Sequence, residues 1–173
     1  KKYTYREFTQ LLSVEKNSEI EKITEESLKS TGELKLLYDI IRDKSFVAFQ
    51  KGRYEEAIET IQTELIKKNR ATSIDYAILG DYYLYSKQFT KAEEAYLLGI
   101  KLNPSEINFQ LNLAHVYLFT DRISEAKTIH KKYSHESLFT GKTWTEQTKI
   151  DFESFEKQQL PTNNFKKILR VLE

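Results

Sequence analysis

Apolar residues recur three and four positions apart over most of this chain of 173 residues, which is the spacing of one face of an α-helix. The stretch YAILGDYYLYSKQFTKAEEAYLLGIKLNP at residues 76–104 has the composition of two helices rich in Tyr and Leu. The β-branched residues are scattered rather than alternating, and 5 glycines with 2 prolines are too few for an all-β protein. The pattern therefore predicts an all-α protein.

The chain also repeats itself. Ala57, Ala92 and Ala126 occupy equivalent places in KGRYEEAIETI, SKQFTKAEEAY and TDRISEAKTIH, at intervals of 35 and 34 residues. Such a period marks a unit of two helices that cannot bury its own apolar face and therefore stacks on its neighbours. Gly80 and Gly99 each cost a helix about 1 kcal/mol relative to alanine, so we predict that another helix packs closely at these positions.

The middle unit resembles the tetratricopeptide repeat family. That family places an aromatic residue, a Leu-Gly pair and a Tyr in its first helix, then Ala, an aromatic residue and Ala in its second, and Pro at the end. The matching residues here are Tyr76, Leu79, Gly80, Tyr83, Ala92, Tyr96, Gly99 and Pro104. The flanking units depart from the pattern: Ala48 replaces the tyrosine of the first, and His130 and Tyr133 replace the aromatic and the late small residue of the third.

The resemblance implies a tetratricopeptide-like α-solenoid of about three helix-turn-helix repeats. We expect these repeats at residues 38–72, 73–106 and 107–134 of one domain, with capping helices at residues 1–37 and 135–173. Ser105 is the expected N-cap of the third repeat, and Thr143 with Glu146 predicts a capping box before a C-terminal helix. The tail is also similar to the C-terminal ends of bacterial repeat proteins, some of which are joined to caspase-like peptidase domains.

The composition limits the chemistry of the chain. Lys and Arg (27) nearly balance Asp and Glu (26), so no global field favours nucleic acid, anionic lipid or an acidic substrate. The absence of cysteine excludes disulfides and thiolate sites, and leaves cytoplasm, periplasm and secretion open, with the cytoplasm favoured. No apolar run reaches the length of about 18 residues that predicts a membrane span. The chain contains no methionine, so we expect a mature form or a part of a larger protein.

Candidate catalytic groups are few. The 3 histidines form no recognised motif, and we interpret His130 and His135 as an ordinary surface pair rather than a metal site. Phosphate-binding, dinucleotide-binding and hydrolase motifs are absent from the sequence. We therefore predict no catalysis, no cofactor and no metal. The alternative of an enzyme requires His115, Asp81 and Arg42 to cluster in a deep pocket.

The family resemblance implies a concave groove lined by the first helices of successive repeats. Transferring that geometry to this chain selects Arg42, Phe46, Phe49, Ala77, Asp81, Leu84, Tyr85, Leu111, Asn112, His115 and Phe119. Such an aromatic lining suits an extended peptide or an amphipathic helix. We therefore predict a protein-protein interaction module within a larger protein or assembly. Asp81 disfavours a clamp for a partner's terminal carboxylate, because two carboxylates repel each other.

Two further interpretations remain at this stage. The aromatic groove residues also fit a structural subunit whose groove is covered by its own C-terminal helix. RNA binding fits the repeat length, because related helical repeats read single-stranded RNA, but the charge balance and Asp81 argue against it.

Overall fold

The computed structural model describes residues 33–173. The chain divides into two compact units, residues 1–43 and residues 44–173. Helix α3 (Glu33–Gln50) begins in the first unit and ends in the second. Except for the start of α3, the predicted N-terminal capping helices at residues 1–37 lie outside the described residues.

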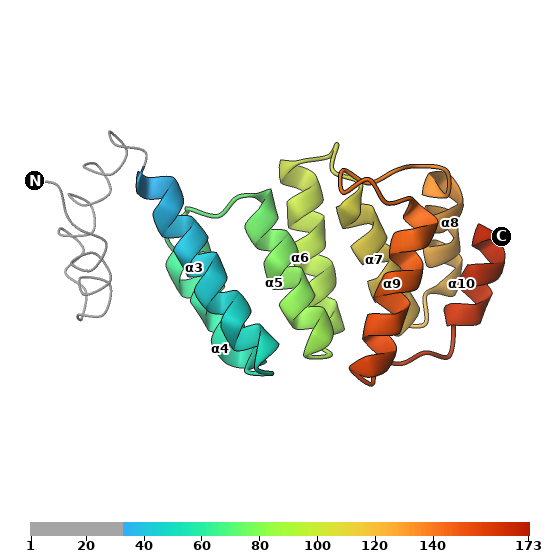
Figure 1. Ribbon diagram of the computed structural model, residues 1–173, viewed down its shortest axis with the longest axis horizontal. Coiled ribbons are helices and arrows are strands. Elements are labelled where there is room, and N and C mark those ends of the chain that lie inside the picture. Colours follow the sequence, from blue (N-terminus) through green and yellow to red (C-terminus); the bar gives the residue numbers. More distant parts are fainter. Residues whose placement is uncertain (1–32) are drawn as a thin grey trace, which may run out of the picture. The chain divides into compact units, whose positions relative to one another are not determined.

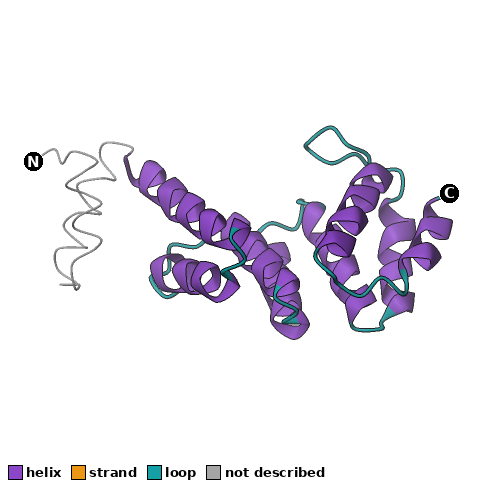
Figure 2. Cartoon of the chain, turned by 60° about the horizontal axis from the view of Figure 1, so that its bottom comes forward, coloured by secondary structure: helices purple, strands orange, loops and turns teal. Residues whose placement is uncertain are grey.

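The second unit consists of helices that follow one another in pairs joined by short turns (Figure 1). In chain order after α3 they are α4 (Tyr54–Ile61) with the short π-helix η1 (Gln62–Ile66), α5 (Ser73–Tyr85), α6 (Phe89–Leu102), α7 (Asn108–Phe119), α8 (Ile123–Tyr133), α9 (Trp144–Lys157) and α10 (Phe165–Leu172). Figure 2 shows only helices and loops in the described part of the chain. The prediction of an all-α solenoid of stacked helix pairs is confirmed.

The turns inside the α5–α6 and α7–α8 pairs are closed in the same way. Lys87 and Asp121 adopt the left-handed backbone conformation, with φ of 62° and 61°. The next amide in each turn, that of Gln88 or Arg122, donates back to the preceding helix at 2.8 and 2.7 Å. This is the Schellman closure, which satisfies a carbonyl at the helix end and reverses the chain. The sequence repeat therefore extends to the backbone of the turns.

The two glycines of the middle repeat lie where helices approach closely. A Cβ placed on Gly80 would lie 2.6 Å from Cδ1 of Tyr96, and a Cβ on Gly99 would lie 2.8 Å from Cδ1 of Phe109. Carbon atoms do not approach this closely without displacing one another, so neither site has room for a side chain. The predicted packing role of Gly80 and Gly99 is confirmed: each leaves room for an aromatic ring from the neighbouring helix.

Helix α9, the first of the two C-terminal helices, begins with a capping box. Thr143 Oγ1 accepts a bond from the Glu146 amide at 3.2 Å, and the Thr143 amide donates to Glu146 Oε2 at 2.8 Å, which is the predicted capping box. Trp144 follows directly and is buried in an apolar cluster with Leu111 and Leu138. No helix within residues 33–173 combines the length and apolar character needed to cross a lipid bilayer.

Candidate functional site

Helix α9 lies against one side of α5 and α7, and we call that side the inner face. Tyr85 Oη of α5 and Ser154 Oγ of α9 are 2.7 Å apart, and His115 Nε2 of α7 lies 2.9 Å from Asp151 Oδ2 of α9. Tyr85 and His115 are both predicted groove residues. The inner face of α5 and α7 therefore corresponds to the surface that the sequence assigned to the groove.

The aromatic ring of Phe155 fills the part of the inner face at the C-terminal ends of α5 and α7. Its centroid lies 5.6 Å from that of Tyr85, 5.1 Å from His115 and 5.2 Å from Phe119. These distances are those of favourable edge-to-face and tilted aromatic pairs. This end of the inner face is thus occupied by the chain itself, so Tyr85, His115 and Phe119 contact α9.

The remaining predicted groove residues have different surroundings. Leu84 and Leu111 are buried, while Phe46 of α3 is 49% exposed. Phe49 stacks on Tyr82, with ring centroids 4.8 Å apart. Arg42 belongs to the first unit, where its guanidinium donates to Asp39 Oδ1 at 2.9 Å.

Asp81 is the acidic centre of the inner face. Tyr96 Oη donates to its Oδ1 at 2.5 Å, and Asn112 Nδ2 donates to the same oxygen at 3.3 Å. The pKa of the Asp81 carboxyl is raised from 3.8 to about 7. Burial is the largest cause of this pKa shift; the hydrogen bond from Tyr96 opposes it, and the nearby charge of Asp151 adds to it. The carboxyl is therefore divided between its neutral and charged forms near neutral pH.

His115 and His130 have structural partners. His130 is fully buried, so its interpretation as a surface residue was wrong. Its Nδ1 accepts a bond from Trp144 Nε1 at 2.9 Å, and burial lowers its pKa to about 3, with His115 contributing to the shift. His115 pairs with Asp151 rather than with Asp81. No set of three or more His, Asp or Glu side chains in residues 33–173 is arranged to hold a metal ion.

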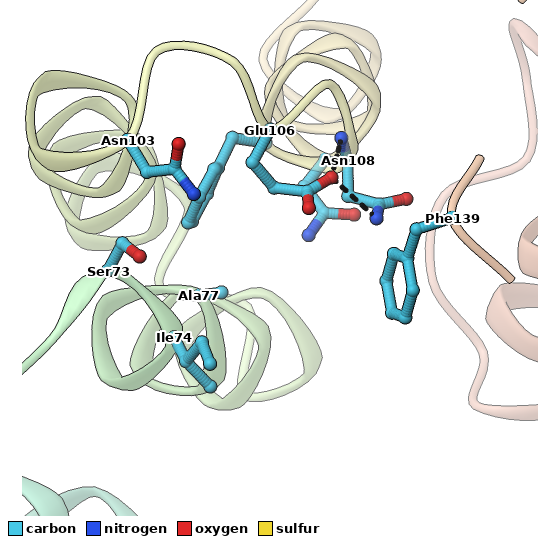
Figure 3. Close-up of a pocket in the computed structure, with 9 residues that line it drawn as sticks. Ser73, Ile74, Ala77, Asn103, Glu106, Asn108 and Phe139 are labelled. Carbon is cyan, nitrogen blue, oxygen red and sulfur yellow. Dashed lines mark hydrogen bonds between the residues drawn. The ribbon is translucent and has the colours of Figure 1, made fainter.

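A pocket of about 430 Å³ lies at the opposite end of the inner face, near the starts of α5 and α7. Its lining residues are Ser73, Ile74, Ala77, Asn103, Glu106, Asn108, Phe109, Asn112 and Phe139. Figure 3 shows Ile74 and Ala77 on one helix, Glu106 and Asn108 at the start of another, and Phe139 on a separate segment. We call this the α5–α7 pocket. Its volume is in the range of protein binding sites.

Two predicted groove residues, Ala77 and Asn112, line the α5–α7 pocket, but the sequence did not identify the others. Phe139 lies in the tight loop before α9, which is closed by the bond from the Leu138 amide to the Lys142 carbonyl at 2.8 Å. Phe139 is 83% exposed and Ile74 is 60% exposed. The only sequence feature that could have identified Phe139 as a site residue is its position as an aromatic residue in a mainly polar loop, and this feature does not indicate which helices the loop approaches.

Glu106 closes the start of α7 within this pocket. Its Oε1 accepts bonds from the backbone amide of Asn108 at 3.0 Å and from Asn108 Nδ2 at 2.8 Å. The expected N-cap, Ser105, instead donates its hydroxyl to Asn103 Oδ1 at 2.8 Å. The prediction of Ser105 as the cap was wrong, because the carboxylate of the next residue reaches the first free amide of the helix.

A second depression, of about 560 Å³, lies between α9 and α10. Lys149, Glu153, Glu156 and Lys166 are among its lining residues, so charges of both signs surround it. None of the predicted groove residues lines it. The α5–α7 pocket is therefore the stronger candidate site.

Comparison with known families bears on the helices that form this pocket. The model of the tetratricopeptide repeat matches residues 76–106. Residues 76–106 are a tetratricopeptide repeat. No curated protein and no solved structure shows significant similarity to the chain. The repeat comprises most of α5, all of α6 and the segment that leads to α7, so it supplies Ala77, Asn103 and Glu106 to the pocket.

Tetratricopeptide repeats generally serve as protein-protein interaction modules rather than as enzymes. The repeat at residues 76–106 therefore suggests a protein-protein interaction module with protein partners. The two helices of the repeat, α5 and α6, are followed and preceded by further helix pairs, and these pairs together form a tetratricopeptide-like solenoid.

Proposed function

We propose that this protein is a non-catalytic interaction module that binds a segment of a partner polypeptide in the α5–α7 pocket. The observation that carries the proposal is that Ala77 and Asn112, two predicted groove residues, line a recess of about 430 Å³ to which no residue of α9 contributes. The covered end of the inner face then supports the fold, while the other end remains accessible to a partner.

The chemistry of the pocket supports a polypeptide ligand. Ile74, Ala77, Phe109 and Phe139 provide an apolar lining. Exposed apolar surface of this kind is characteristic of interaction sites, and burying one large apolar side chain there contributes roughly 1.5 to 3 kcal/mol. The side-chain amides of Asn103, Asn108 and Asn112 also line the pocket, and amides can both donate to and accept from a peptide backbone.

An alternative is that the protein is a structural subunit whose inner face serves only to hold α9. The contacts of Ser154, Asp151 and Phe155 with α5 and α7 favour this alternative. The two functions make different predictions for the uncovered pocket. A structural subunit has no need of a ligand there, whereas an interaction module loses binding when the pocket is filled.

Binding of peptides by matched variants distinguishes the two functions. Peptides are selected from a random displayed library on the whole chain, and their affinities are measured by fluorescence anisotropy for the wild type, Ala77→Phe and Leu98→Phe. Ala77→Phe puts an aromatic ring into the pocket, and Leu98→Phe puts one on the outer side of α6, where Leu98 is 45% exposed. Circular dichroism verifies that both variants remain folded.

The proposal predicts that the selected peptides bind at least tenfold more weakly to Ala77→Phe, which corresponds to the loss of roughly 1.4 kcal/mol, while Leu98→Phe binds as the wild type does. Equal binding to all three proteins would contradict the proposal. Failure to select any peptide would also contradict it, and would favour the structural subunit.

A further inference from the structure

The charges of the α5–α6 and α7–α8 pairs are segregated. Helix α5 carries only the carboxylates Asp75 and Asp81 as charged residues, and helix α7 carries none. The lysines of these pairs lie elsewhere, on the outer helices and in the first turn, at Lys87, Lys91, Lys101, Lys127, Lys131 and Lys132. Helices α5 and α7 therefore carry no lysine or arginine, although the chain has a net charge of only +1.

Helix ends contribute to the field at the α5–α7 pocket. Both α5 and α7 begin there, and each helix start carries a partial positive charge equivalent to about half a unit. A carboxylate compensates each one: Asp75 Oδ2 accepts from the Thr72 amide at 2.8 Å, and Glu106 Oε1 accepts from the Asn108 amide at 3.0 Å. At the start of α7, the full negative charge of Glu106, which lines the pocket, exceeds the partial positive charge of the helix end.

The lining of the pocket carries the same sign. Glu106 is the only ionisable residue among the lining residues, and the bond from Asn112 to Asp81 places a second carboxyl directly behind them. No lysine or arginine lines the pocket. A wall with carboxylates and no cation attracts positively charged segments and repels acidic ones.

We infer that the partner segment is basic and apolar: a large apolar side chain enters the α5–α7 pocket, and an adjacent lysine or arginine lies against Glu106. This inference rests on the proposed function, because it names the class of polypeptide that the pocket selects. The apolar lining provides the anchor, and the carboxylate provides discrimination between basic and acidic segments. Acidic segments are excluded by the same charge.

The library selection described above also tests this inference. Clones that lose binding to Ala77→Phe are identified as pocket ligands, and their sequences are examined for lysine or arginine beside the apolar anchor. One such peptide is synthesised twice, with its basic residues intact and with glutamine in their place. Both peptides are titrated into the wild type, Glu106→Gln and Glu94→Gln at low and high salt.

Glu106→Gln keeps the side-chain oxygen that accepts from the Asn108 amide and removes only the charge. Glu94→Gln removes the same charge from the outer side of α6, where Glu94 is exposed. We expect Glu106→Gln to weaken the basic peptide roughly threefold to fivefold at low salt and to leave the glutamine peptide unchanged. Glu94→Gln is expected to change neither.

The outcomes separate the inference from the function on which it rests. If no selected peptide is sensitive to Ala77→Phe, the proposed function fails. If pocket ligands are found but lack basic residues, or if Glu106→Gln binds the basic peptide as tightly as the wild type does, the pocket is a binding site and the inference about its ligand is wrong. Enrichment of basic pocket ligands together with the charge-dependent loss would support both.

Discussion

Gly80→Ala tests whether the repeat is held together by close contact between helices. The new Cβ would lie 2.6 Å from Cδ1 and 2.8 Å from Cζ of Tyr96, so the ring or the helix must move. Overpacking of this kind costs roughly 1 to 3 kcal/mol, and the better helix propensity of alanine returns about 1 kcal/mol. We therefore expect a net loss of up to about 2 kcal/mol in the free energy of unfolding.

The same substitution made in a Tyr96→Leu background isolates the contact. Leucine lacks the aromatic ring that meets the Cβ, so Gly80→Ala should there be neutral or stabilising by up to about 1 kcal/mol. Gly52→Ala is the control, because Gly52 has φ of 72° and no atom within 4 Å of an added Cβ. Its cost, from the left-handed backbone alone, should be equal in both backgrounds.

Urea unfolding of the whole chain, followed by far-UV circular dichroism, measures the four free energies of each cycle. The account predicts a coupling of roughly 2 kcal/mol between positions 80 and 96 and none between positions 52 and 96. An equal cost of Gly80→Ala with and without the ring of Tyr96 would refute the reasoning.

Three other changes test particular contacts. Asp81→Asn keeps the oxygen that accepts from Tyr96 and Asn112. Because the pKa of Asp81 is raised to about 7 in the folded protein, the wild type loses stability as the pH rises from about 4 to 7. The free energy of unfolding of the variant, measured in urea, should match that of the wild type at pH 4 and exceed it at pH 8 by roughly 2 to 4 kcal/mol. Phe155→Ala removes the ring that covers the inner face and should destabilise by about 3 to 5 kcal/mol, with faster hydrogen exchange in α9. Thr143→Ala breaks the capping box and should cost about 1 kcal/mol; unchanged exchange at the start of α9 would argue against that role.

The local features of the fold were predictable from sequence because they depend on short spacings. Gly80 sits inside a helical pattern where only a close neighbour explains it, and the structure places Tyr96 there. Thr143 and Glu146 have the spacing of a capping box, and the structure contains both of its hydrogen bonds. Periodicity and capping chemistry are properties of neighbouring residues, so a single sequence is sufficient to identify them.

The position of α9 could not be predicted in the same way. Its pattern indicates an apolar face with Phe152 and Phe155, but not which surface that face meets. The bond between His115 and Asp151 joins residues on different helix pairs, and no spacing rule connects them. The alternative of a structural subunit whose groove is covered by its C-terminal helix stays a prediction; the contacts with Tyr85 and His115 come from α9. The predicted link to caspase-like peptidase proteins stays a prediction.

The α5–α7 pocket was missed for a related reason. Phe139 reaches it from a loop, and Glu106 reaches it because it caps α7 in place of Ser105. Both depend on the path of a connecting segment, which sequence patterns determine less well than the faces of helices. Only Ala77 and Asn112 were identified in advance, because they lie on the helical stripes of the predicted groove.

The most direct test of the binding site is a nuclear magnetic resonance titration of the whole chain, methyl-labelled at alanine and isoleucine, with a library-selected peptide. The account predicts that the methyl signals of Ala77 and Ile74 shift on binding, while those of Ile150 on α9 and Ala57 on α4 do not. Shifts concentrated on α4, α8 or α9, with Ala77 and Ile74 unchanged, would contradict the claim that a polypeptide binds between α5 and α7.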